Sequence, residues 1–211
     1  MSRGARIVAG IILAGCAVGE AAPATFTVHR NSQATFRTDA PLEAVVGTTA
    51  GSGTVTGSVT LDLARPQEAT GEIRVDLGTL KTGIANRDAH MVGPDWLDIQ
   101  QEVNRYAVFK ITTIEIAGPL EAGREVAAKV RGVLTIRQKA VETRVDARIA
   151  YLKLSNAEAE ALRRAGYGPD IVRVRAKLQT TFTNHGMQVP QLYFLRVSNE
   201  IQLDVDLTLT R

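Results

Sequence analysis

Hydrophobic and polar residues alternate with a period of two over much of the chain. The alternation is clearest over residues 54–63, 72–77, 141–151, 172–182 and 201–210. Such alternation predicts strands with one buried and one solvent-facing side, as in antiparallel sheets. Shorter or less regular strands are expected at 26–29, 34–38, 42–47, 106–116 and 125–137. The pattern therefore predicts an all-β protein.

The length of these segments and the size of their inward residues predict a hollow barrel. Several segments run for about ten residues, whereas strands of about five or six are typical. At ~3.4 Å per residue and a tilt of ~40°, about eight such strands would close an antiparallel barrel roughly 26 Å tall. Val145, Ala147 and Ala176 fall on the inward faces, which hold few aromatic residues. Small inward residues favour a cavity for an elongated ligand, although a barrel filled by its own side chains is the alternative.

Two segments break the strand pattern and predict one or two short helices. Ser155 and Glu158 form a capping box, and Gly166 provides a stop, which together predict a helix at 156–165. Residues 86–97 read as a loop with one or two helical turns that begin at an Asn86 cap.

A basic start followed by a short apolar run marks the beginning of the chain as an export signal. Arg3 and Arg6 precede the apolar run at 7–14, which is far shorter than the ~20 residues that a membrane span needs. Small residues follow, as in a secretory signal peptide. We therefore expect a signal peptide at 1–24 and one exported, periplasmic domain at 25–211.

Two cleavage sites compete within this signal. The tetrapeptide Leu13-Ala14-Gly15-Cys16 matches the bacterial lipobox, after which the cysteine is lipidated and anchors the protein to a membrane. Cys16 is the single cysteine of the chain, which favours lipidation. Cleavage near Ala21 to Ala24 is the alternative and would release a free periplasmic protein.

Charge and composition exclude several classes of protein. Cleavage before Cys16 removes two arginines and leaves 23 basic and 22 acidic residues, so a nucleic-acid partner has little electrostatic support. One cysteine excludes an internal disulfide and a multi-cysteine zinc site. The sequence contains no nucleophile elbow, phosphate-binding loop or dinucleotide fingerprint. We therefore expect no catalytic residues, no cofactor and no metal.

One polar cluster has two interpretations. Arg87 and His90 could bind an anionic head group while Trp96 covers an apolar tail. Alternatively, Arg87 and Asp88 tie their loop to the sheet and Trp96 plugs one barrel end. Among the remaining histidines, His29 is expected at the surface or a sheet edge, and His185 in a turn.

The order of these features resembles the YceI-like family of exported, lipocalin-like proteins. The residues that carry the resemblance span most of 26–211 and are Gly57, Leu61-Asp62, Thr82-Gly83, Arg87-Asp88, His90-Met91, Trp96-Leu97-Asp98, Phe109 and Gly132-Val133-Leu134-Thr135-Ile136. The Thr-Gly…Arg-Asp-x-His-Met segment is the specific part. The glycine that usually follows the Leu-Thr-Ile strand is replaced near Arg137-Gln138.

The resemblance implies an extended antiparallel barrel that holds a long amphiphile, typically a polyisoprenoid or an isoprenoid quinone. It also implies a binding protein without assigned catalytic residues in the bacterial envelope. The candidate ligand-binding residues are then Arg87, His90, Trp96, Phe109, Val145, Ala147 and Ala176. A structural or stress-linked envelope protein with a filled barrel is the alternative, and the oligomeric state stays open.

Overall fold

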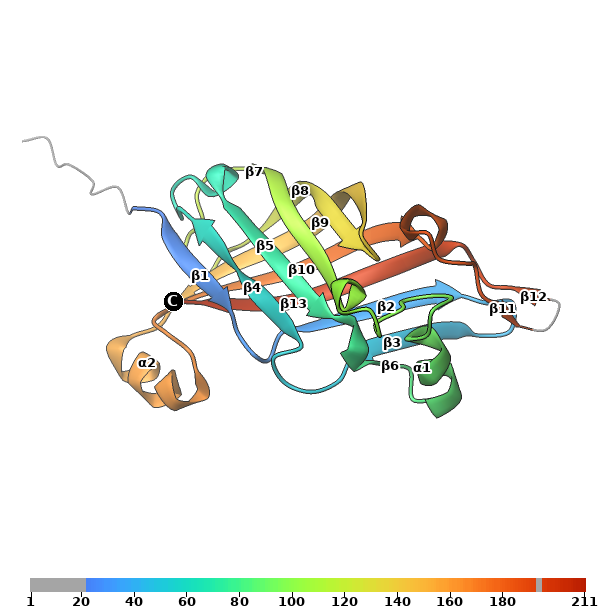
Figure 1. The fold of residues 1–211 in the computed structure, drawn as a ribbon. Helices are drawn as coiled ribbons and strands as arrows, with labels where there is room; N and C mark the ends of the chain where they lie inside the picture. The colour runs from blue at the N-terminus through green and yellow to red at the C-terminus, as the bar shows by residue number, and fades with distance from the viewer. Residues whose placement is uncertain (1–21, 193–194) are drawn as a thin grey trace, which may run out of the picture.

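A computed structural model describes residues 22–192 and 195–211, so Cys16 and all but the last three residues of the predicted signal peptide at 1–24 lie outside the described residues. Eight strands close an antiparallel barrel, which confirms the predicted fold (Figure 1). Around the barrel they are β1 (Ala24–Val28), β4 (Val55–Leu61), β5 (Thr70–Asp76), β7 (Tyr106–Ile116), β8 (Glu125–Ile136), β9 (Lys139–Lys153), β10 (Asp170–Thr181) and β13 (Glu200–Thr210). Pairing of β1 with β13 closes the circle.

Shorter strands extend the wall at one end of the barrel. There β2 (Gln33–Asp39) takes over from β1 along β13, and β3 (Ala44–Thr49) and β6 (Leu80–Lys81) follow beside it. A separate hairpin, β11 (Gln191–Leu192) and β12 (Leu195–Arg196), lies at the same end.

Two α-helices mark opposite ends of the barrel (Figure 1). We call them the α1 end, after α1 (Ala85–Met91), and the α2 end, after α2 (Asn156–Leu162). Within the described residues, five single-turn 3-10 helices occupy connections: η1 (Pro66–Glu68), η2 (Leu77–Thr79), η3 (Glu102–Asn104), η4 (Arg163–Ala165) and η5 (Thr183–His185).

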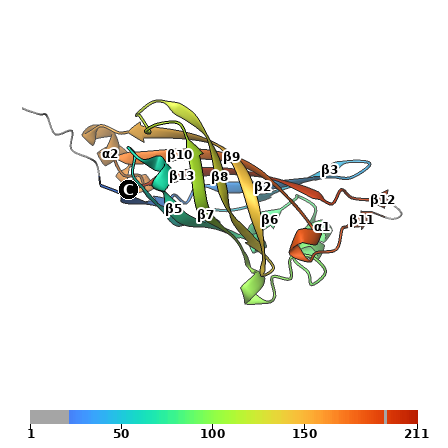
Figure 2. The same ribbon diagram turned by 90° about the horizontal axis from the view of Figure 1, so that it is seen from above.

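The strands β7 to β10 and β13 are long, as the alternation predicted. They contain 11 to 15 residues each, and β9 is the longest. Figure 2 shows the resulting elongated barrel from above, with β7 to β9 wrapping across it. This length gives the interior its elongated shape.

The helix after β9 follows the prediction, whereas the helix near residue 86 begins differently. Ser155 and Glu158 form both hydrogen bonds of the capping box, and Gly166 ends the segment with a φ of 95°. Asn86 is not the cap of α1, because the helix starts at Ala85 and Ile84 occupies the capping position without a side-chain bond. The polar group that organises this turn is instead Asp88, described below.

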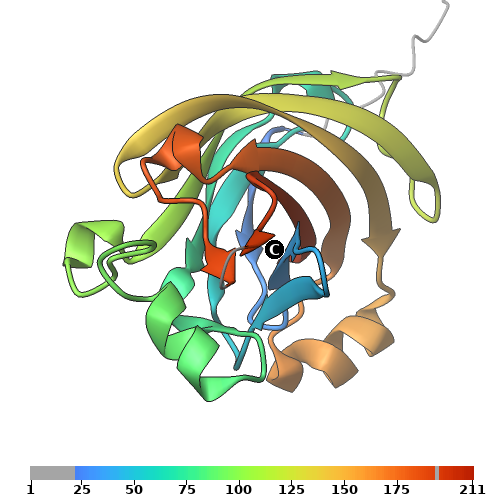
Figure 3. The same cartoon turned by 90° about the vertical axis from the view of Figure 1, so that its right-hand side faces the viewer.

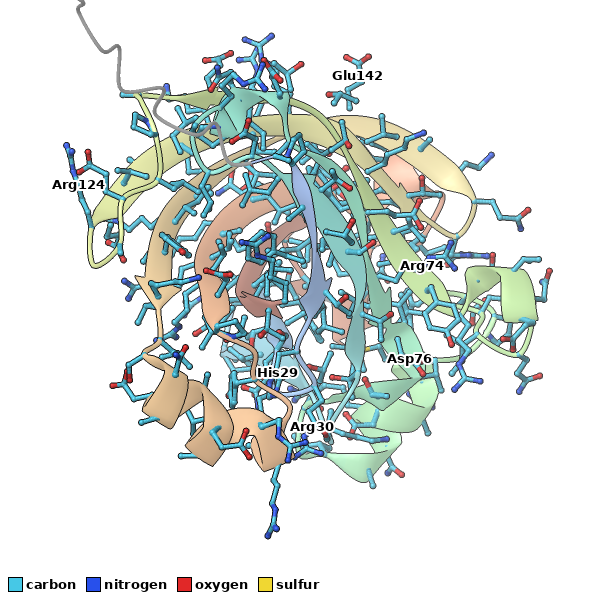
Figure 4. The ribbon with its side chains drawn as sticks, turned by 90° about the vertical axis from the view of Figure 1, so that its left-hand side faces the viewer. His29, Arg30, Arg74, Asp76, Arg124 and Glu142 are labelled. Atoms are coloured by element: carbon cyan, nitrogen blue, oxygen red, sulfur yellow. The ribbon has the colours of Figure 1, made fainter. Side chains whose placement is uncertain are left out.

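His29 is buried rather than at the surface, which corrects the prediction. Its side chain is 4% exposed, and its ring stacks on Tyr167 with centroids 4.0 Å apart. Its Nε2 donates to the carbonyl of Ala165 at 2.9 Å, while Nδ1 accepts from the amide of Asn31 at 3.3 Å. In the view onto the α2 end in Figure 4, His29 lies between β1 and the segment after α2. The segment after α2 covers it, which alternation along the chain could not reveal.

A buried carboxylate joins strand ends at the α2 end. Asp170 accepts from the hydroxyl of Tyr151 at 2.6 Å, Nζ of Lys153 at 2.8 Å and Nε of Arg211 at 2.9 Å. Burial by itself would raise the pKa of Asp170, but these donors outweigh it and hold the pKa below its usual range. Burial, together with the hydrogen bond to Asp170, raises the pKa of Tyr151 to about 12. This end is therefore fastened by strand pairing and by ion pairs.

Candidate functional site

The barrel encloses an apolar cavity of about 190 Å³. Its lining comes from both sides of the barrel and from both ends. Leu61 and Leu209 lie toward the α2 end, and Leu80 and Ile136 lie toward the α1 end. Thr35 is the one polar residue among the described residues of the lining, and its hydroxyl is paired with that of Thr48 at 2.9 Å. The cavity can therefore contact hydrocarbon but offers little to a polar group.

A row of small residues crosses the middle of the wall. The strand registers place Ala128, Ala147, Ala176, Val205 and Ala34 opposite one another on five successive strands from β8 to β2. Four of the five, all except Ala128, line the cavity. Because an alanine side chain extends only one carbon from the backbone, this row leaves space that leucines would fill.

Two phenylalanines lie against glycines in the same wall. A Cβ on residue 47 would lie 2.8 Å from Cζ of Phe36 and closer still to Cε1. A Cβ on residue 132 would lie 2.8 Å from Cε1 of Phe109 and closer still to Cζ. Both rings line the cavity. The glycines let the rings lie close to the wall instead of projecting across the interior.

The predicted interior residues meet at this cavity. Phe109, Val145, Ala147 and Ala176 all line it, from β7, β9 and β10. Phe36 and Ala34 line it too but were not singled out from the sequence, although the alternation along β2 places both on one face. Whether these side chains contact a ligand stays a prediction.

The predicted polar candidates lie outside the cavity lining. Arg87 pairs with Glu43 at 2.6 Å, which ties α1 to the loop between β2 and β3. His90 is exposed, with its ring centroid 6.3 Å from that of Trp96. Trp96 packs against the edge of the core, and its Nε1 donates to the carbonyl of Gln188 at 3.1 Å. Whether Arg87, His90 and Trp96 also contact a ligand stays a prediction.

Asp88 organises the start of α1. Its Oδ1 accepts from the hydroxyl of Thr82 at 2.7 Å and from the Thr82 amide at 2.8 Å. These hydrogen bonds lower the pKa of the Asp88 carboxyl. Asp88 thereby fastens the first turn of α1 to the segment that precedes the helix.

Loops gather at the α1 end of the barrel. Figure 3 looks onto this end and shows α1, η3, η5 and the β11–β12 hairpin gathered around it. Leu97 and Met187 come from two of these loops, are 7% and 5% exposed, and belong to the core without lining the cavity. They pack into the core at the α1 end.

Residues 22–209 match the model of the YceI-like domain. The chain belongs to the YceI-like family. No curated protein matches this YceI-like chain. In the part of the chain that the structure describes, no helix has the length and apolar character to span a bilayer, and no group of three or more His, Cys, Asp or Glu residues could hold a metal ion.

Three solved structures share this YceI-like fold. BcnA of Burkholderia cenocepacia is 17% identical with a TM-score of 0.60, covering 84% of this chain and 95% of BcnA. A polyisoprenoid binding domain of Saccharophagus degradans, implicated in plant cell wall breakdown, is 12% identical with a TM-score of 0.61, covering 90% and 99%. The YceI protein of Campylobacter jejuni is 15% identical with a TM-score of 0.57, covering 78% and 83%. At these identities the likeness concerns the fold.

Proposed function

We propose that this protein binds the hydrocarbon chain of a long amphiphile, a polyisoprenoid or an isoprenoid quinone, inside its barrel. The observation that carries the proposal is the elongated cavity, whose described lining is apolar apart from Thr35. Burial of apolar surface stabilises a bound chain by roughly 25 cal/mol per Å². The polyisoprenoid binding domain of Saccharophagus degradans, which shares the fold, supports this class of ligand.

The lining supports binding rather than catalysis. None of the described residues around the cavity carries a side chain that titrates near neutral pH, and general acid–base chemistry needs such a group within hydrogen-bond reach of the substrate. We therefore propose a non-catalytic carrier or buffer. The export signal that we predict at residues 1–24 would place it in the bacterial cell envelope.

The volume of the cavity limits the length of lipid chain that can bind without a change in the structure of the barrel. An engineered apolar cavity of ~150 Å³ binds benzene, whereas pockets for drug-sized ligands occupy ~300–1,000 Å³. At about 190 Å³, the cavity would take a short stretch of a polyisoprenoid. A longer chain could bind only if the interior widened. The small volume of the cavity also favours the alternative, a structural envelope protein with a filled barrel.

Mass spectrometry of an organic extract of the purified protein tests the proposal. We expect an isoprenoid lipid in the extract and its absence from the extract of Ala147→Trp, because the indole would fill the middle of the cavity. Gln179→Trp is the matched control, since Gln179 is exposed on the outer face of β10 and should leave the lipid bound.

The folded state of each variant has to be checked by circular dichroism. If wild-type protein carries no lipid and takes up none after reconstitution with polyprenol, the filled-barrel alternative replaces the carrier. If Ala147→Trp folds and retains as much lipid as Gln179→Trp, the ligand lies elsewhere.

A further inference from the structure

The non-glycine residues that adopt a left-handed backbone conformation lie together at the α1 end of the barrel. Among residues 22–192 and 195–211, the non-glycine residues with positive φ are Asp98 at 50°, Arg137 at 47° and Gln138 at 60°. Arg137 and Gln138 form the two-residue turn between β8 and β9, where Asn-Gly is favoured because both positions are left-handed. Strained backbone of this kind persists where surrounding contacts hold it, often at switch regions.

One buried side chain joins two of these positions, Asp98 and Gln138. Asn104 is 3% exposed, and its Oδ1 accepts a hydrogen bond from Nε2 of Gln138 at 3.2 Å. Its Nδ2 lies 3.3 Å from both the carbonyl oxygen and Oδ2 of Asp98. The exposed turn residue Gln138 is thereby tied through Asn104 to the loop that carries Leu97.

Two further bonds tie the same loops to the segment that carries Met187. Arg137 donates from Nη1 to the carbonyl of Gly186 at 3.3 Å, and Trp96 donates to the carbonyl of Gln188 at 3.1 Å. The loops that bear Leu97 and Met187 are therefore joined to each other and to the β8–β9 turn by side-chain hydrogen bonds. Within these loops, the backbone amides of Leu97 and Met187 donate to the carbonyls of Met91 and Phe182. The α2 end, in contrast, is closed by strand pairing and by the ion pairs of Asp170.

We propose that the loops bearing Leu97 and Met187 form a gate through which the apolar chain passes, and that the Gln138–Asn104 hydrogen bond is its latch. This inference rests on the proposed function, and it explains how a chain longer than the resting cavity gains access. The latch residues lie outside the cavity lining, so they stabilise the closed gate in the empty and the loaded protein alike.

The gate predicts a specific kinetic signature. A latch that contacts no ligand shifts the closed-to-open equilibrium equally with and without ligand, so its loss accelerates binding and release by the same factor and leaves Kd unchanged. Loss of one ordinary hydrogen bond corresponds to an increase of about two- to tenfold in both rate constants. A residue that only stabilises the barrel would not change both rates in this way.

Stopped-flow fluorescence with delipidated full-length mature protein and all-trans-retinol, a short isoprenoid, measures both rates. The first variant is Gln138→Gly, because glycine suits a φ of 60° and the change removes the latch without adding strain. Asn104→Ala is the second variant and breaks the same bond from its buried side. Lys153→Met is the control, since it removes a contact to Asp170 at the α2 end.

We expect Gln138→Gly to raise both rate constants with thermal stability equal to or above that of the wild type, and Lys153→Met to leave them unchanged. Unchanged rates in Gln138→Gly and in folded Asn104→Ala overturn the gate while the proposed function stands. If only Lys153→Met accelerates binding and release, the portal lies at the α2 end, and the proposal of a gate at the α1 end is overturned. If wild-type protein takes up neither retinol nor polyprenol, the proposed function and the gate both fail.

Discussion

Phe36 and Gly47 lie directly opposite each other on β2 and β3, and the ring occupies the place that a side chain at residue 47 would need. The three atoms nearest to a Cβ at that position all belong to the Phe36 ring. Since Phe36 also lines the cavity, the glycine sets how far the ring projects into the interior. A similar contact links Phe109 on β7 to Gly132 on β8, although Gly132 lies opposite Ile111 and the carbonyl oxygen of Lys110 is also among the nearest atoms.

Replacement of Gly47 by alanine should therefore displace the Phe36 ring into the cavity. We expect Gly47→Ala to destabilise the fold by about 1–3 kcal/mol, as overpacking does, and to weaken retinol binding. In a Phe36→Leu background the same change should cost less, because the ring is gone. Urea unfolding of the four proteins in this cycle measures the coupling. Equal costs in both backgrounds would show that the ring does not restrict residue 47.

Buried His185 should make the protein less stable in mild acid. Its Nδ1 donates to the carbonyl of Lys139 at 3.2 Å, so Nε2 accepts from the hydroxyl of Thr180 at 2.7 Å, and both nitrogens are satisfied in the neutral ring. Burial lowers the pKa of His185 below its ordinary value of about 6.5. The unfolded chain therefore binds a proton first, so this contribution is complete above about pH 6.5 and is lost as the pH falls below it.

Urea midpoints at pH 7.5 and 5.5 test this assignment. His185→Gln should reduce the difference between the two midpoints, since glutamine does not titrate, while His90→Gln on the exposed face of α1 should preserve it. An undiminished difference in folded His185→Gln would assign the pH dependence to other groups.

Removal of the buried carboxylate at the α2 end should destabilise the barrel. Asp170→Asn leaves Lys153 and Arg211 without their partner, and we expect a loss of about 2–3 kcal/mol. Asp204→Asn is the matched control, because its ion pair with Lys177 is exposed and should contribute less than about 1 kcal/mol. Chemical unfolding at pH 7 compares the two. A similar small loss in both variants would mean that the α2 end is held by strand pairing alone.

Lipidation of Cys16 is the prediction that concerns the location of the protein. If the lipobox is used, the mature protein should begin at Cys16, carry acyl chains and fractionate with membranes, because several chains anchor stably. Cys16→Ala should then block maturation or release a soluble form. Intact mass and membrane fractionation of both proteins provide the measurement. A soluble wild-type protein that starts near Ala22 or Thr25 without added lipid mass would support the free periplasmic form.

The sequence by itself determined the barrel and its interior residues. Alternation is a local property, because successive side chains of a strand point to opposite faces, so it placed Val145, Ala147 and Ala176 inside without any knowledge of strand order. Phe109 was a candidate only through the resemblance to the YceI-like family. The capping box at Ser155 was equally local, since both of its hydrogen bonds form within one helical turn.

Only the tertiary structure decided what the loops do. Arg87 pairs with Glu43, which lies 44 positions earlier in the chain, and His29 is covered by a segment more than 130 residues later. The meeting of Asn104 with Gln138 likewise depends on how the β8–β9 turn and η3 pack at the α1 end. These contacts depend on strand register and loop packing, which no periodicity along the chain encodes.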